Sequence, residues 1–383
     1  MIRQCAAALG TLALSCSFYT SCPKGQRVSS GQCVSDGSNP GNNAGGNGGD
    51  QNPVILGTIP SAPWNAATGN LDGMPAGYGS ICYVSPKPDE DLLITGISAA
   101  GLWASRDGGQ SWQLLGTKPG SAPVPNRPNL ITYDPEHPEV FWEAGPYGEG
   151  VFQTKDNGDT FERLGKLENN DAIGIDFTDP NRQTLVASGH EQGHILYRTT
   201  DGGSNWQDIS GTFPPDANAC NYPVLVDGQT YLVGCSQFGG GLGGIYRTVD
   251  SGASWERVSE VSAWASPLLS SDGSIYWPIE SDNGLLRSTD QGLTWSRVIA
   301  GSTLTVHPLE LPDGRIVTIT KECAIASSDH GATWRRVSSQ LPFVPAGIAY
   351  STFQKAFFVW YLSPTGAVPG DSIMRFDFDF EVE

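Results

Sequence analysis

The sequence predicts an all-β fold, a β-propeller of seven four-stranded blades, from three observations. The chain has 383 residues with 48 glycines and 27 prolines, and only 16% of its residues are charged. This composition is typical of many short strands and turns. No segment keeps the apolar i, i+3, i+4, i+7 spacing of an amphipathic helix over several turns. One short turn-like motif occurs repeatedly at intervals of about 39 to 49 residues, and such periods indicate an array of blades.

The first 15 residues have the features of a signal peptide. Arg3 precedes the apolar run Cys5 to Leu14, which is too short to span a bilayer. The end of this run, LALSC, resembles a bacterial lipobox, which implies that Cys16 is acylated and becomes the first mature residue. Ordinary cleavage after Ser15 is the alternative. We therefore expect an exported protein, either an outer membrane lipoprotein of the bacterial cell envelope or a secreted protein.

Residues 16–53 are expected to form a cysteine-containing segment and a linker. The stretch CPKGQRVSSGQC reads as a small loop closed by a Cys22–Cys33 disulfide. The following DGSNPGNNAGGNGGDQNP has almost no apolar residue, so it is predicted to be a disordered, flexible tether. The folded domain is expected to occupy residues 54–383.

Two cysteines of the folded domain are placed for a second disulfide. Cys220 and Cys235 lie on either side of a predicted turn at Asp227-Gly228. Neighbouring antiparallel strands would bring them together, and an oxidising compartment would permit the bond. No CxxC motif or His/Cys cluster is present, so we predict neither a metal site nor a cofactor.

The repeated motif is expected to turn the third strand of each blade into the fourth. It reads Ser/Thr-x-Asp-x-Gly, followed by a Trp or Phe, and has a short apolar run on either side. The Asp side chain can accept hydrogen bonds from nearby backbone N–H groups, and the Gly can adopt a positive φ. Two further strands precede each copy, which completes four-stranded units. The motif aspartates are Asp107, Asp156, Asp201, Asp250, Asp290 and Asp329.

The number of blades follows from what remains after the last motif. The C-terminal part contains three further predicted strands without a motif, at residues 347–350, 356–362 and 372–379. Val54–Ile59 is expected to supply the fourth strand of a seventh blade. This closure would join the two chain ends and remove exposed strand edges. Six blades, with the C-terminal strands as an edge or cap, are the alternative.

The full pattern, Ser/Thr-x-Asp-x-Gly-x-Ser/Thr-Trp/Phe, resembles the Asp-box (BNR) repeat over roughly residues 90–383, and Asn205 is its only departure. The units LITYDPEHPEVFWEAG and GIDFTDPNRQTLVASG are similar to repeats of sortilin-type receptors and seven-bladed xyloglucan-cleaving glycosidases. Sialidases and photosystem assembly factors are further members of this group. The resemblance implies a propeller whose site lies on the face opposite the boxes, and it leaves activity open. Sialidase activity is not expected, because VILGTIP lacks the arginine of the sialidase signature.

Acidic residues gather in the predicted loops between the second and third strands, on the face opposite the boxes. A glycosidase needs two carboxyl groups at a fixed separation, one of them with a raised pKa. The candidates are Glu143, Glu191, Glu280, Asp282 and Glu322. Candidate ligand-binding residues are Trp142, Tyr147, His190, His194, Trp264, Trp277, Trp360 and Tyr361. Each of these has an ordinary alternative role in a solvated loop or in the core, whereas the face as a whole is the predicted binding face.

The charge balance narrows the choice of partner. The net charge is −18, from 22 basic and 40 acidic residues, which argues against nucleic acid. We favour a monomeric binding module for a glycan or a protein at or outside the cell surface, in contact with the membrane only through a lipid anchor. The alternatives are a glycoside hydrolase that uses two of the acids above, and an envelope assembly or scaffold protein. The sequence favours a binding protein without deciding whether the chain is an enzyme.

Overall fold

The computed structural model describes residues 26–29, 32–35, 55–280, 284–301, 303–363 and 366–381, which belong to two separate units. In the first unit, β1 (Gln26–Ser29) and β2 (Gln32–Ser35) form an antiparallel hairpin. The expected signal peptide, Cys16, the Cys22–Cys33 disulfide and the tether fall on residues or side chains outside the described part, so they stay predictions.

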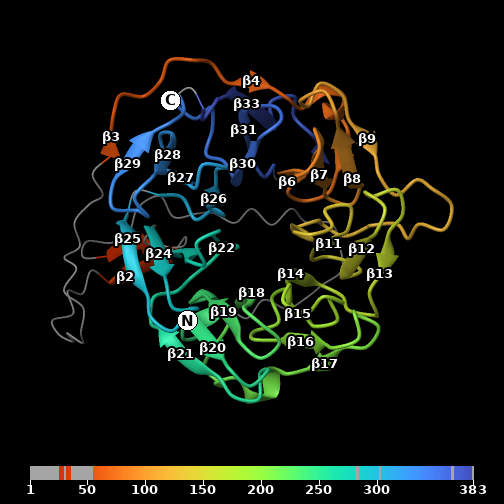
Figure 1. The fold of residues 1–383 in the computed structure, drawn as a ribbon, viewed down its shortest axis with the longest axis vertical. Coiled ribbons are helices and arrows are strands. Elements are labelled where there is room, and N and C mark those ends of the chain that lie inside the picture. The colour runs from red at the N-terminus through yellow and green to blue at the C-terminus, as the bar shows by residue number, and fades with distance from the viewer. Residues whose placement is uncertain are drawn as a thin grey trace. The chain divides into compact units, whose positions relative to one another are not determined.

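The second unit contains seven four-stranded antiparallel blades arranged in a ring, which confirms the predicted fold (Figure 1). The strands of blade 1 are β6 (Ile81–Pro86), β7 (Leu93–Ile97), β8 (Gly101–Ser105) and β9 (Gln113–Leu114). Those of blade 2 are β10 (Leu130–Tyr133), β11 (Phe141–Ala144), β12 (Val151–Thr154) and β13 (Glu162–Arg163). Those of blade 3 are β14 (Asn170–Ile175), β15 (Leu185–Gly189), β16 (Leu196–Thr199) and β17 (Gln207–Asp208).

The remaining blades follow in chain order. The strands of blade 4 are β18 (Cys220–Leu225), β19 (Tyr231–Cys235), β20 (Gly244–Thr248) and β21 (Glu256–Ser259). Those of blade 5 are β22 (Leu268–Leu269), β23 (Ile275–Pro278), β24 (Gly284–Ser288) and β25 (Ser296–Ala300). Those of blade 6 are β26 (Leu309–Glu310), β27 (Ile316–Ile319), β28 (Ala324–Ser327) and β29 (Trp334–Arg336). Those of blade 7 are β30 (Gly347–Ser351), β31 (Ala356–Trp360), β33 (Ile373–Asp377) and β4 (Asn65–Ala66).

A few short elements lie outside the blades. β5 (Pro75–Ala76) and β32 (Gly366–Ala367) pair as a small separate sheet. Three 3-10 turns are η1 (Gly69–Leu71), η2 (Ser210–Thr212) and η3 (Phe238–Gly240). Within the described part of the chain, no helix is long and apolar enough to cross a membrane.

The N-terminal segment closes blade 7 as expected, but with a different strand. β4 pairs with β33, whereas β3 (Ile55–Leu56), inside the predicted Val54–Ile59, pairs in parallel with β29 of blade 6. The prediction was wrong because the apolar side chains of this run pack against the core beside blade 6. The residues that close blade 7 are fixed by polar contacts instead: Thr68 Oγ1 accepts the N–H of Ile373 at 3.0 Å.

The six motifs form the turns between third and fourth strands. In the first, Ser105 Oγ lies 2.8 Å from Asp107 Oδ1 and accepts the N–H of Gly109 at 2.9 Å. The Asp107 carboxylate also accepts the backbone N–H and the hydroxyl of Ser111, at 2.9 and 2.6 Å. The other five turns repeat this pattern, and Asn205 replaces the hydroxyl with an amide nitrogen 2.8 Å from the Asp carboxylate. The carboxylates of the motif are thus committed to the turns.

Replacing Asp107 with alanine is expected to lower the free energy of unfolding by about 1 kcal/mol, because the turn loses three hydrogen bonds in an exposed position. Urea unfolding measures this effect. Asp371→Ala is the matched control, since Asp371 is exposed and accepts no hydrogen bond from the described residues. Equal stability of the two variants would show that the carboxylate does not hold the turn.

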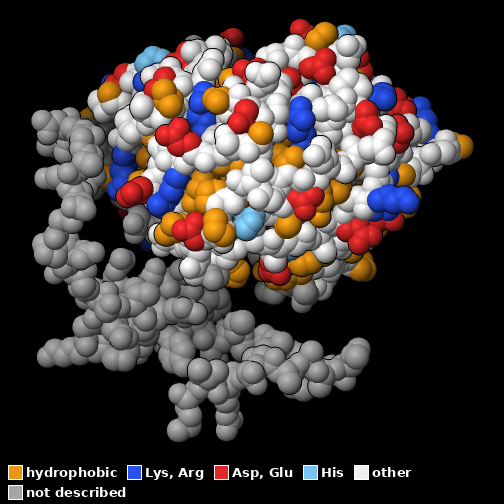
Figure 2. Space-filling view, turned by 90° about the horizontal axis from the view of Figure 1, so that it is seen from below, with side chains coloured by type: hydrophobic (Ala, Val, Ile, Leu, Met, Phe, Trp, Pro, Cys, Tyr) orange, Lys and Arg blue, Asp and Glu red, His pale blue; other side chains and the backbone are white. Residues whose placement is uncertain are grey.

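The hydrophobic core lies between neighbouring blades, and its clusters combine side chains from adjacent sheets. Several large aromatic side chains are almost completely buried there, namely Trp112, Trp142, Trp277, Trp334, Tyr231 and Phe357. Cys220 and Cys235 form a disulfide between β18 and β19, and Cys82 and Cys323 are free and buried. On the side of the molecule drawn in Figure 2, acidic side chains are interspersed with basic and uncharged ones instead of forming one patch.

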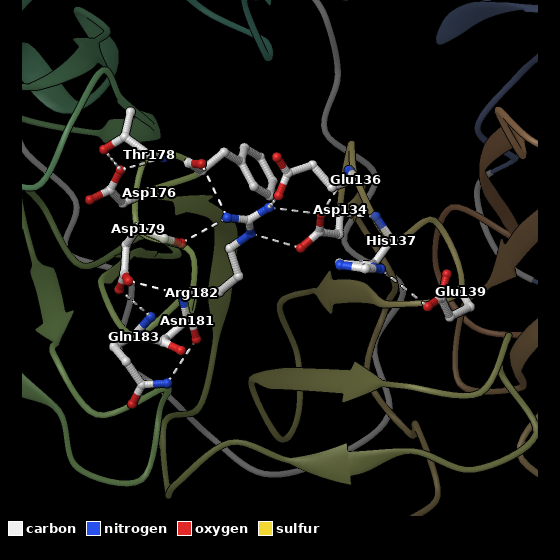
Figure 3. A network of polar contacts seen from close by, with 11 residues as sticks. Asp134, Glu136, His137, Glu139, Asp176, Thr178, Asp179, Asn181, Arg182 and Gln183 are labelled. Atoms are coloured by element: carbon white, nitrogen blue, oxygen red, sulfur yellow. Dashed lines mark hydrogen bonds and ion pairs between the residues drawn. The ribbon is translucent and has the colours of Figure 1, made fainter.

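Blades 2 and 3 are joined by a buried ion pair (Figure 3). Its residues lie in the turns between first and second strands, and these turns are at the same end of the blades as the Asp boxes. The Arg182 guanidinium donates from Nε to Asp134 Oδ2 at 2.8 Å and from Nη2 to Asp134 Oδ1 at 3.1 Å. Nη2 also contacts Glu136 at 2.7 Å, and Nη1 donates to the carbonyl oxygens of Phe177 and Asp179. The side chains of Arg182 and Asp134 are only 9% and 4% exposed. This contact ties the first turn of one blade to that of the next.

Candidate functional site

A cavity of about 970 Å³ lies where the first strands of the blades meet around the propeller axis. Figure 1 shows these strands nearest the centre of the ring. Much of the lining comes from the beginnings of first strands and from loops between second and third strands. Because each box joins a third strand to a fourth, these residues lie at the other end of the blades. We call this end the opposite face.

The five predicted acids occupy different environments. Glu191 and Glu280 line the cavity. Glu191 is exposed, whereas Glu280 accepts the backbone N–H of Gln237 at 2.9 Å. Glu322 is exposed in the loop after β27 and does not line the cavity. Asp282 lies outside the described residues.

Glu143 lies inside β11 and not in a loop as the sequence suggested. Its side chain is fully buried and does not line the cavity. Asn126 Nδ2 donates to Oε2 at 3.2 Å, and Oε1 has no hydrogen-bond partner among the described groups. Burial raises the pKa of Glu143 from 4.5 to about 8, against a lowering effect of the Asn126 hydrogen bond. The group is therefore mainly protonated at neutral pH.

The predicted tryptophans divide between core and cavity. Trp264 and Trp360 line the cavity, and Trp360 Nε1 donates to the carbonyl oxygen of Cys82 at 3.0 Å. Trp142 and Trp277 are fully buried in the cores between blades and do not line it. The sequence pattern could not distinguish a core tryptophan from one that lines the cavity, because both kinds can stand at the end of an apolar strand.

The other predicted ligand-binding residues surround this region. His190 lines the cavity, and the Tyr147 ring packs edge-on against it with 4.8 Å between ring centroids. His194 Nδ1 lies 3.0 Å from the carbonyl oxygen of Ala217, and its ring stacks on Phe213. Tyr361 packs on another ring outside the cavity lining.

His190 forms a pair with Asp171, a residue that the sequence interpretation missed. His190 Nδ1 lies 2.7 Å from Asp171 Oδ1. Burial alone would lower the pKa of His190, but the hydrogen bond and charge of Asp171 raise it above its usual value. Asn129 Nδ2 donates to the Asp171 carbonyl oxygen at 2.8 Å. The pair is thus fixed at the wall of the cavity.

Arg127 and Tyr222 also line the cavity and were missed. Like Asp171 and Asn129, they stand at or just before the start of a first strand. In a propeller these strand ends face the axis, so strand order together with polar residues at these positions could have revealed them. No cluster of three or more His, Cys, Asp or Glu residues that could hold a metal ion is found in the described ranges.

No protein-family model matches the chain. A xyloglucanase of Paenibacillus sp is 22% identical over 241 residues, which cover 51% of this chain and 23% of the xyloglucanase. The Photosystem II assembly lipoprotein Ycf48 of Prochlorococcus marinus is 24% identical over 240 residues, 51% of this chain and 68% of that protein.

Solved structures show the same fold. YCF48 bound to D1 peptide matches with a TM-score of 0.51 and 17% identity, covering 85% of this chain and 100% of that one. The match to the xyloglucanase, by contrast, spans only about a quarter of that enzyme's length. The chain is therefore a seven-bladed β-propeller with xyloglucanases and a photosystem assembly lipoprotein among its relatives.

Proposed function

We propose that the chain is an exported Asp-box β-propeller, lipid-anchored through Cys16, that binds a glycan or a protein partner in the axial cavity. The observation that carries the proposal is the cavity itself, about 970 Å³ on the propeller axis. Its lining is mainly apolar and aromatic, and its polar groups include Arg127, the His190–Asp171 pair and the carboxylates of Glu191, Glu280 and Glu310. This combination is typical of ligand sites.

Exposed apolar side chains surround the same region. Phe238 and Val344 are 66% and 70% exposed and line the cavity. Tyr78 and Tyr147 are more than half exposed, and they contact Arg127 and His190 of the cavity wall. Large apolar groups gathered on one face of a propeller support a contact surface for a partner.

The relatives support both kinds of partner. The name xyloglucanase specifies a glycan as substrate, and YCF48 has been solved with a peptide bound. The name of Ycf48 also specifies a lipoprotein, which agrees with acylation of Cys16 and with export to the cell envelope. A protein partner would include the role of an envelope assembly protein.

Glycoside hydrolysis is the second candidate, because two of the named acids, Glu191 and Glu280, line the cavity. Retaining enzymes hold their carboxyl groups about 5 Å apart and inverting enzymes about 6.5 to 9.5 Å apart. Binding without hydrolysis is favoured because Glu280 already accepts a backbone N–H, and Glu143, the acid with the raised pKa, does not line the cavity.

The test compares cavity variants with a variant on the box face. A glycan array and a pull-down with the full chain identify ligands, and calorimetric titration measures their affinity. Trp264→Ala and His190→Ala are expected to weaken binding at least tenfold, since both residues line the cavity. The melting temperature of each variant shows that it is folded at the temperature of the titration. The exposed His330→Ala, in a box turn, should leave affinity unchanged.

Equal losses in all three variants would contradict the proposal. The same titrations with xyloglucan oligosaccharides are followed by product analysis. Sugar products that disappear with Glu191→Gln or Glu280→Gln would replace binding by hydrolysis as the function.

A further inference from the structure

We propose that the axial cavity takes an apolar carboxylate, whose carboxylate group is bound between Arg127 and His190. The proposal rests on the cavity being a binding site, as argued above, and it names the chemistry of the ligand. The carboxylate could belong to the C-terminus of a polypeptide or to a free organic acid, and both present the same group to the site.

Arg127 has no counter-ion and no close hydrogen-bond acceptor among the described residues. It lines the cavity, yet no carboxylate of the described residues forms an ion pair with it. The one hydrogen bond of its guanidinium to the described residues, from Nη1 to Asn129 Oδ1, is 3.5 Å long, and its buried Nε has no acceptor among them. Arg163, Arg182 and Arg287 lie within 3.3 Å of a carboxylate. Other partly buried arginines donate to neutral hydroxyl or carbonyl oxygens instead, namely Arg198, Arg247, Arg257 and Arg336. A guanidinium removed from water without a partner costs free energy, which a ligand anion would offset.

The surroundings hold the Arg127 guanidinium in place without an ion pair. It lies over the Tyr78 ring, 5.6 Å from the centroid. On another side it meets the backbone of Gly79, where a Cβ would come within 2.7 Å of Nε. Gly79 also has a φ of 87°, which glycine adopts most readily. The donor is therefore positioned before any ligand arrives, which reduces the entropy lost on binding.

His190 supplies a second donor to the same cavity. Its Nδ1 is occupied by Asp171, while its Nε2 is buried without a hydrogen-bond partner, and the nearest carboxylate oxygen, of Glu191, is 3.8 Å away. Both residues line the same cavity, and the charge of Arg127 also acts on the pKa of His190. A carboxylate has two acceptor oxygens and can satisfy both nitrogens.

The cavity wall contributed by blades 6 and 7 is mostly apolar, which favours a ligand with an apolar portion. It is formed mainly by the side chains of Leu304, Val306, Val344, Ile348, Trp360 and Leu362. Two acids of the lining are held by the protein: Glu280 by the N–H of Gln237, and Glu310 by the N–H and hydroxyl of Ser271. Glu191, beside His190, is exposed at the cavity wall. The free donors and the apolar wall together favour a molecule with one carboxylate and a hydrocarbon portion over a polyhydroxylated neutral sugar.

The test is calorimetric titration of the full chain with two matched pairs of probes. One pair is an acetylated tripeptide that ends in leucine, with a free carboxylate or a C-terminal amide. The other pair is phenylbutyrate and phenylbutanol. In at least one pair the acid is expected to bind tenfold or more tightly than its uncharged partner, because charge-assisted hydrogen bonds form only with the acid. This comparison needs no variant and is unaffected by folding defects.

Arg127→Gln is expected to abolish the preference for the acid. Arg198→Gln should preserve it, because Arg198 bonds to the Tyr231 hydroxyl and does not line the cavity. A preference confined to the peptide pair supports the site and assigns the carboxylate to a polypeptide end. A preference in the phenylbutyrate pair supports it for free acids.

Acids that bind no more tightly than their uncharged partners, or a preference that survives Arg127→Gln, would overturn the carboxylate site. The proposed function fails separately, when ligands found on the array or in the pull-down are unaffected by Trp264→Ala. A ligand that depends on Trp264 but shows no preference for a carboxylate would leave the cavity as a binding site of other chemistry.

Discussion

Replacing Arg182 with alanine is expected to lower the free energy of unfolding by about 3 to 5 kcal/mol, because it leaves a buried carboxylate without its partner. Asp134 is 4% exposed and receives two hydrogen bonds from this guanidinium. Burial alone would raise the pKa of Asp134, but the bonds from Arg182 and from two backbone N–H groups lower it overall. The variant loses all of the Arg182 contacts at once, at the junction of two blades.

Urea unfolding at neutral pH measures this loss, and Arg106→Ala is the matched control. Arg106 also pairs with a carboxylate, Glu90, at 2.8 Å, but its side chain is 66% exposed. An exposed pair contributes less than about 1 kcal/mol. The loss of stability in Arg182→Lys should lie between those of Arg182→Ala and Arg106→Ala, since lysine keeps the charge but cannot form the bidentate contact. A loss at Arg182 no larger than at Arg106 would show that the junction does not depend on this ion pair.

Replacing Glu143 with glutamine is expected to remove a pH dependence of stability and to stabilise the protein by about 3 kcal/mol at pH 7. Burial raises the pKa of Glu143 from 4.5 to about 8. Between pH 4.5 and pH 8 the folded state therefore keeps a proton that the unfolded state has released. The free energy of unfolding therefore falls as pH rises through this window, and the loss is complete above pH 8. Glutamine carries no charge to bury and can accept the same bond from Asn126.

Unfolding curves at pH 5, 6, 7 and 8 test this expectation. The difference between variant and wild type should grow steadily with pH and level off above 8. Glu149→Gln provides the control, because Glu149 is 45% exposed in a pair with Arg163 in the same blade. Parallel curves for wild type and Glu143→Gln would show that the buried carboxyl does not titrate in the folded protein.

The fold was predictable where it depends on local contacts. The bonds of Ser105, Asp107 and Ser111 span only a few residues, so the sequence shows them directly. The strand that closes blade 7 was not predictable, because its position depends on a polar contact between Thr68 and a residue 305 positions away. An apolar run such as Ile55–Leu56 signals a strand but does not say which edge it joins.

The candidate site was predictable in position and only partly in composition. Strand order placed His190 and Glu191 opposite the boxes, and both line the cavity. Arg127 and Asp171 were missed because they precede or begin first strands, where a single polar residue looks like an ordinary turn position. Glu143 was placed in a loop because a strand buried on both faces shows no alternation of polar and apolar residues.

The pairing of β4 with β33 also determines when the propeller ring can close during synthesis, because the two strands come from opposite ends of the domain. Thr68 leaves the ribosome long before Ile373, its hydrogen-bond partner 305 residues further along. At about 5 to 20 residues per second this interval is roughly 15 to 60 seconds. Until then the ring stays open and β4 has no partner strand. A chain that leaves the cytoplasm during this delay would cross the membrane before blade 7 is complete. Its ring would then close in the compartment where the Cys220–Cys235 disulfide can form.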